Sequence, residues 1–238
     1  MLRKVLLVCG ILSSLLYAAM IGAIRFEGYS PISKTVSELS AIGAPTRPLW
    51  MVLGAVYDAL ALAFGLGVWV SAGGKRALRV VGGLLLALGM FGWVWPFASM
   101  HQREVLAAGG ATLSDTLHLI LTMVTVLFML VAIGVGATAF GNRFRSYSIA
   151  TMLVLFIFGA LTGLDGPRVA ANLPTPWAGL WERINIGVFL LWIVVLAITL
   201  LQVKDATVTE ISRLRRDETF AAWDVRQVSQ GGRAKPCP

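Results

Sequence analysis

The sequence predicts an all-α fold, a polytopic membrane helix bundle of six transmembrane helices with both termini in the cytoplasm. Three observations lead to this prediction. Of the 238 residues, 57% are hydrophobic and only 13% are charged, whereas soluble domains average about 25% charged residues. Six apolar stretches approach the roughly 20 residues that a helix needs to cross a bilayer. Basic residues also concentrate on one side of these stretches, as they do in the cytoplasmic loops of membrane proteins.

The six predicted spans are residues 5–23, 49–70, 80–97, 117–140, 147–164 and 179–203. The first resembles a signal peptide in having Arg3 and Lys4 before it, but its apolar run is longer than a typical signal sequence and five more spans follow. The third and fifth are the shortest and can cross only with little tilt. Residues 1–203 therefore form a six-span domain. Residues 204–238 form a basic cytoplasmic tail, which begins either as a helix on the membrane surface or as a solvated extension, and has a loose end.

Orientation follows from the twenty basic residues. With the N-terminus inside, fourteen of them lie in the cytoplasm and six outside, which satisfies the positive-inside rule. The outer six are Arg25, Lys34, Arg47, Arg103, Arg168 and Arg183. Because topology accounts for the net charge of +8, no nucleic-acid partner is needed, and the expected partner is the lipid bilayer. Most carboxylates and both histidines face outward, so we expect any polar site to open to the extracytoplasmic side.

The first two candidate ligand-binding residues are Glu38 and Asp58. Glu38 follows Thr35 by three residues, which fits a capping box at the start of a short helix that stops at Gly43. Alternatively, Glu38 dips into the mouth of the bundle as a base or ligand. Asp58 lies near the middle of the second span, where a carboxylate is costly and should face the bundle interior. Asp58 is either a hydrogen-bonded packing residue, with Tyr17 as a possible partner, or a proton or ligand site.

Asp115 and His118 are three residues apart, so they share a face at the outer end of the fourth span. The pair could bind a metal or transfer a proton, but Ser114 as an N-cap and Asp115 at the helix dipole give a purely structural explanation. Two histidines are few for a zinc site, so we predict no bound metal and no cofactor. Asp115 and His118 are only weak metal candidates.

Glu182 and Arg183 enter the last span together and point about 100° apart around a helix, so they should not satisfy each other. We expect one of them to pair with another span, for instance Arg183 with Asp115 or Asp165. The alternative is that Arg183 binds an anion. The chain contains no phosphate-binding loop and no common hydrolase signature.

Three short motifs give the chain a family resemblance. They are Ser37-Glu38-Leu39-Ser40-Ala41, Asp115-x-x-His118 and Gly179-Leu180-Trp181-Glu182-Arg183. In order and spacing they resemble a group of prokaryotic six-span proteins, the domain-of-unknown-function 998 (DUF998) family, over roughly residues 5–203. The resemblance implies an integral membrane protein and brings no established activity. The residues after the third span, including His101, depart from that pattern.

Three classes of function remain. The first is an outward-facing binding or carrier protein for a small polar molecule or a lipid headgroup, which we favour because the polar groups gather at one mouth. The second is a metal-dependent membrane hydrolase that acts on lipid. The third is a structural membrane subunit whose polar groups only fix the helices. The expected location is a prokaryotic inner membrane.

Overall fold

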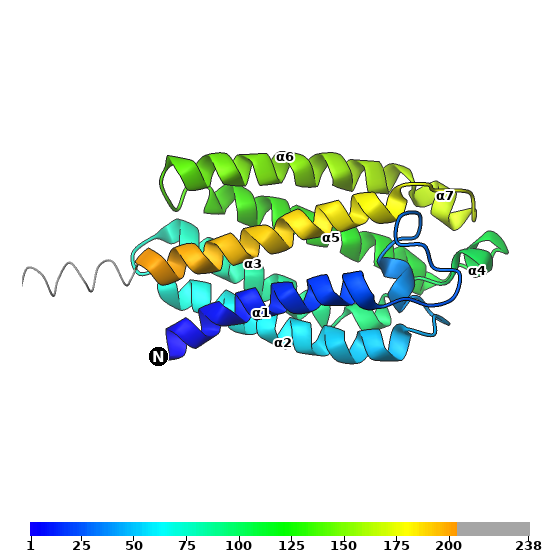
Figure 1. Ribbon diagram of the computed structural model, residues 1–238, viewed down its shortest axis with the longest axis horizontal. Helices are drawn as coiled ribbons and strands as arrows, with labels where there is room; N and C mark the ends of the chain where they lie inside the picture. Colours follow the sequence, from blue (N-terminus) through cyan, green and yellow to red (C-terminus); the bar gives the residue numbers. More distant parts are fainter. Residues whose placement is uncertain (204–238) are drawn as a thin grey trace, which may run out of the picture. The chain divides into compact units, whose positions relative to one another are not determined.

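Long helices make up most of the chain. The computed structural model describes residues 1–203, of which Met1–Ile198 form one compact unit. The long helices are α1 (Leu2–Ala23), α2 (Arg47–Ser71), α3 (Arg76–Gly92), α5 (Leu113–Gly136), α6 (Asn142–Leu164) and a C-terminal helix (Ala178–Val203). Figure 1 shows α1, α2, α3, α5 and α6 running lengthwise beside one another. No strand occurs among residues 1–203, which confirms the predicted all-α class.

The two ends of this unit differ. At one end, which we call the loop end, lie three long connections, residues 24–46, 93–112 and 165–177. They contain the short helices η1 (Ser37–Ser40), η2 (Trp95–Phe97), α4 (Arg103–Ala107) and α7 (Gly166–Ala170). At the other end, which we call the basic end, residues 72–75 and 137–141 are short connections. The N-terminus also lies at the basic end (Figure 1).

Five helices in the described part of the chain are long and apolar enough to cross a membrane. The third predicted span, residues 80–97, was wrong in its bounds, because α3 runs from Arg76 to Gly92 and has 17 residues. The apolar run continues to Phe97, but the backbone turns after Gly92 into η2, which contains Pro96. Proline cannot donate the backbone hydrogen bond that a longer helix would need there. The predicted surface helix in the tail lies outside the described residues.

Small residues let α2 and α3 approach closely. A methyl group placed on Gly65 of α2 would lie 2.8 Å from the backbone nitrogen of Leu86. On the facing side, a methyl group on Gly82 of α3 would lie 2.7 Å from the backbone nitrogen of Trp69. Such close backbone contact is typical of helices that associate inside membranes, where packing replaces the hydrophobic driving force.

Hydrogen bonds tie the C-terminal helix to its neighbours. The side-chain amide of Asn185 donates to the carbonyl of Leu155 in α6 at 2.6 Å. The indole of Trp192 donates to the hydroxyl of Ser148 in α6 at 3.0 Å. On the other side, the hydroxyl of Ser14 in α1 donates to the carbonyl of Leu190 at 3.2 Å. These bonds place the C-terminal helix between α1 and α6.

Candidate functional site

A buried ion pair joins the connections at the loop end. Glu38 in η1 is 1% exposed and Arg103 at the start of α4 is 5% exposed. The guanidinium binds the carboxylate through two bonds, Nε to Oε1 at 2.7 Å and one terminal nitrogen to Oε2 at 2.8 Å. This two-pronged geometry is the strongest arrangement available to an arginine and a carboxylate.

The remaining polar atoms of this pair are also satisfied. Glu38 Oε2 accepts from the backbone nitrogen of Thr35 at 2.7 Å and from its hydroxyl at 3.0 Å. Arg103 donates to the hydroxyl of Thr175 at 2.8 Å and to the carbonyl of Ser33 at 3.2 Å. Thr35 and Glu38 therefore interact at the predicted spacing, but the predicted capping box was wrong: η1 is a short 3-10 turn whose N-cap is Val36, and no side chain caps it. Through Arg103, the pair connects all three loops.

Glu182 and Arg183 bind the first connection rather than another span. Glu182 accepts hydrogen bonds from the backbone nitrogen of Val36 and from the hydroxyl of Ser37. Arg183 donates to the carbonyl of Pro31 at 2.8 Å and to the hydroxyl of Tyr29 at 2.7 Å. The predicted pairing of Arg183 with Asp115 or Asp165 was wrong. Carbonyl oxygens and a phenol bind the two terminal nitrogens of the guanidinium in place of an acid, whereas its buried Nε has no hydrogen-bond partner among residues 1–203.

Tyr29 completes the contacts that Glu182 and Arg183 make with the first connection, and we call these three residues the anchor. Its hydroxyl donates to the carbonyl of Thr35 at 2.8 Å while it accepts from Arg183. Burial raises the pKa of the Tyr29 phenol, and the hydrogen bond from Arg183 opposes that rise. A phenol is protonated at neutral pH, and the raised pKa extends this to a more alkaline range, so Tyr29 serves as donor and acceptor at once.

Asp115 and His118 belong to a separate cluster at the start of α5. Asp115 accepts from the backbone nitrogen of His101 at 2.7 Å, and its other oxygen lies 2.8 Å from His101 Nδ1. Asp115 also accepts from the backbone of Thr112 at 2.8 Å. Thr112 and Asp115 form a capping box, so the prediction of Ser114 as the N-cap was wrong. Asp115 thus closes the helix and holds the second connection.

His118 points to a different partner. Its Nδ1 lies 2.9 Å from the carbonyl of Ala98, and because a carbonyl only accepts, Nδ1 carries the proton. The ring packs edge-on against Trp95 with a centroid distance of 5.0 Å. Among residues 1–203, no three histidine, cysteine or acidic side chains lie close enough together to hold a metal ion.

Asp58 lies apart from the loop clusters, on α2. It is 8% exposed, and its carboxylate packs against Gly92, the last residue of α3. No hydrogen bond joins Asp58 to Tyr17 in the described part of the chain. The Tyr17 ring instead contacts the ring of Tyr57, with a centroid distance of 4.7 Å. Asp58 therefore faces the bundle interior, as predicted.

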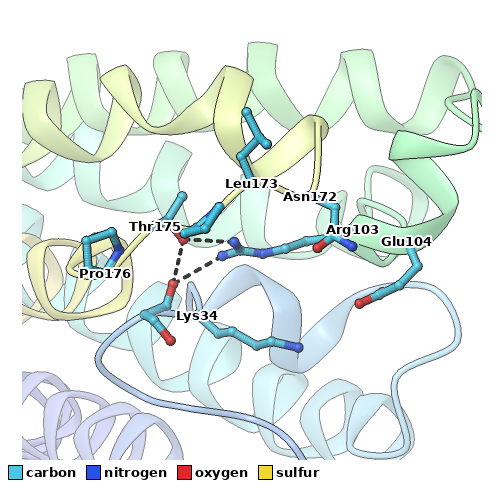
Figure 2. A pocket seen from close by; sticks show the side chains of 9 residues that line it. Lys34, Arg103, Glu104, Asn172, Leu173, Thr175 and Pro176 are labelled. Carbon is cyan, nitrogen blue, oxygen red and sulfur yellow. Dashed lines mark hydrogen bonds between the residues drawn. The ribbon is translucent and has the colours of Figure 1, made fainter.

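Residues of the three connections line an open pocket of about 310 Å³, whose lining is partly polar and partly apolar. Figure 2 shows the guanidinium of Arg103 directed at Thr175, with Lys34 and Glu104 extending from different connections toward one side of the pocket. Asn172 and Pro174 contribute to the lining from the third connection. Arg103 is occupied by its hydrogen bonds, whereas Lys34 and Glu104 have opposite charges and form no ion pair within residues 1–203. The pocket therefore offers one cation and one anion to a ligand.

Four important residues were not predicted from the sequence: Arg103, Tyr29 and the pocket residues Lys34 and Glu104. The one signal for Arg103 was that basic and acidic residues are equally numerous in the predicted outer regions, which suggests internal pairing. Nothing in the sequence places Tyr29 beside Arg183, because 154 positions separate them.

Comparisons with known proteins identify a family. Residues 8–199 match the family described as "Protein of unknown function (DUF998)". Searches of curated proteins and of solved structures found no match. Because the match covers most of the chain, the protein belongs to the DUF998 family, as the three sequence motifs indicated.

Proposed function

We propose that this member of the DUF998 family is a membrane protein that binds a small polar molecule or a lipid headgroup in the loop-end pocket. The observation that carries the proposal is that Lys34 and Glu104 line the same pocket and form no ion pair within residues 1–203; the Lys34 ammonium lies 5.7 Å from the centre of the Phe26 ring. A ligand with both charges, such as a phosphoethanolamine group or an amino acid, would complement them.

The size of the pocket supports a small ligand. At about 310 Å³, it lies at the lower end of the 300–1,000 Å³ range that is typical of small-molecule sites. The Glu38–Arg103 pair supports its wall, because Arg103 lines the pocket and connects the loops. Asp115, Glu182 and Arg183 act in this proposal by holding the loops in place, and His118 by its bond to Ala98.

A carrier role would also involve Asp58, the buried carboxylate of α2. We propose that Asp58 takes part only if the bound molecule moves inward, as a proton or ligand site. In that case Asp58→Asn abolishes uptake into proteoliposomes and leaves binding at the pocket intact. Uptake equal to that of the wild type would restrict the function to binding.

We also propose that all six long helices cross a prokaryotic inner membrane, with the termini in the cytoplasm and the loop end outside. The acid-free basic connections support this orientation. Single cysteines in place of Lys34 and Gly73, in a chain without its native cysteines, test it with a membrane-impermeant maleimide in intact cells. Labelling of the Lys34 position alone supports the orientation, and labelling of the Gly73 position alone contradicts it.

The binding test is a titration of the purified protein with soluble phosphoethanolamine and, separately, with phosphatidylethanolamine in nanodiscs. Lys34→Gln and Glu104→Gln should each weaken binding at least tenfold. Glu27→Gln is the matched control, because Glu27 is exposed at the same end and does not line the pocket. Binding of the soluble probe indicates a free polar ligand, and binding of the lipid alone indicates a headgroup. No binding of either, or equal loss in the control, would contradict the proposal.

A further inference from the structure

A second hollow lies at the basic end of the bundle, between α5 and α6. It has a volume of about 220 Å³. Its lining is mostly apolar or small and comprises Gly134, Ala137, Thr138, Arg145, Ser148, Ile149 and Met152. Thr138 and Ile149 are exposed, so the hollow opens on the outer surface of the helix pair. On helices of membrane-spanning type, such a surface faces lipid.

The charges around this groove all have the same sign. Arg145 lines it and is exposed, and no ion pair or hydrogen bond engages its guanidinium among residues 1–203. Lys75 lies at the neighbouring turn, where its ammonium donates to the carbonyl of Ala139 at 3.1 Å and lies 5.2 Å from the centre of the Phe140 ring. The segments 72–79 and 137–150 contain five basic residues and no acid. Nothing in these two segments can neutralise Arg145.

We propose that this groove binds an anionic phospholipid, with its phosphate at Arg145 and the upper part of one acyl chain along Gly134, Ile149 and Met152. Charge complementarity supports this occupant, because basic pockets between membrane helices bind anionic headgroups. The apolar lining supports an attached acyl chain rather than a free phosphate. The site is independent of the loop-end pocket and lies at the opposite end of the bundle.

Gly134 lines the groove, so a larger residue at this position tests whether an acyl chain lies there. A methyl group on Gly134 would contact only the Met152 sulfur, at 3.6 Å, which is an ordinary van der Waals distance. The Cβ of a leucine at this position therefore meets no backbone atom beyond its own turn of helix, and the rest of the side chain adds bulk to the lining of the groove. The bulk of Gly134→Leu should exclude the acyl chain while the charge of Arg145 is kept.

The experiment is native mass spectrometry of the full chain in detergent with added dioleoyl phosphatidylglycerol, dioleoyl phosphatidylcholine or glycerol 3-phosphate. We expect selective binding of phosphatidylglycerol, about fivefold weaker binding in Arg145→Gln, and a comparable loss in Gly134→Leu. Arg76→Gln is the matched control, because Arg76 is an exposed arginine at the same end that does not line the groove.

Three results would overturn the proposal. The first is equal binding of phosphatidylglycerol and phosphatidylcholine. The second is an equal loss in Arg145→Gln and Arg76→Gln, which would indicate general surface attraction. The third is tight binding of glycerol 3-phosphate, which would show that no acyl chain is needed. Unchanged thermal stability of Arg145→Gln separates loss of the site from loss of the fold.

Discussion

We expect the Glu38–Arg103 ion pair to contribute strongly to the free energy of unfolding. Removal of one partner from a buried ion pair leaves an uncompensated charge and typically costs about 3–5 kcal/mol. Both side chains are at most 6% exposed, and two charge-assisted bonds of 2.7 and 2.8 Å join them. We therefore expect Glu38→Leu and Arg103→Met each to lower the free energy of unfolding by about 3–5 kcal/mol.

A double-mutant cycle isolates the interaction from the other contacts of each residue. The Glu38→Leu/Arg103→Met double variant leaves no buried charge, so it should be more stable than the sum of the two single losses implies, by about 2–3 kcal/mol. The assay is unfolding in mixed micelles of increasing SDS fraction, followed by tryptophan fluorescence. The more exposed pair of Asp165 and Arg168, 4.0 Å apart with side chains 14% and 51% exposed, is the matched control and should couple by less than about 1 kcal/mol. If the losses at Glu38 and Arg103 add to within about 0.5 kcal/mol, the two side chains do not stabilise each other as proposed.

Two further substitutions test other contacts by the same unfolding assay. Gly92→Ala should destabilise the protein by about 1–3 kcal/mol, because its new methyl group would overlap the Asp58 carboxylate. Gly54→Ala, where a methyl group meets nothing within 4 Å, should be neutral or stabilising, and equal losses at both glycines would contradict this packing. Tyr29→Phe should cost about 1–3 kcal/mol, because it removes a buried phenol that donates and accepts. Tyr147→Phe is its control, since the Tyr147 hydroxyl is buried without a partner in the described chain. If Tyr147→Phe lowered the free energy of unfolding as much as Tyr29→Phe, the hydrogen bonds of Tyr29 would not be the cause of its loss.

Hydrophobic runs predicted most of the long helices, but they did not predict the ends of all of them. The first, second and last apolar runs match α1, α2 and the C-terminal helix to within a few residues. The third apolar run did not match its helix, because an apolar sequence need not be helical. The chain around Pro96 turns while its sequence remains apolar. Helix ends are determined by backbone hydrogen bonding, which hydropathy does not report.

The candidate residues were easier to find than their partners. Glu38 and Arg183 are polar residues beside apolar runs, so composition alone draws attention to them. Their contacts lie 65 and 152 positions away in the sequence, and no local pattern encodes such separations. The partners of Arg183 are backbone carbonyls and a phenol, so a search for an opposite charge led to the wrong prediction. Asp115 was interpreted correctly as a helix-start residue, because a capping interaction spans only three positions.

In the proposed function, Lys34 and Glu104 hold a ligand with two opposite charges in the loop-end pocket. The most direct test is native mass spectrometry of the gently solubilised protein after incubation with phosphatidylethanolamine, in the wild type and in the Lys34→Gln/Glu104→Gln variant. We expect the wild type to retain one lipid per chain and the folded variant to retain none. Equal retention by both proteins, or a wild type that stays bare at saturating lipid, would contradict it.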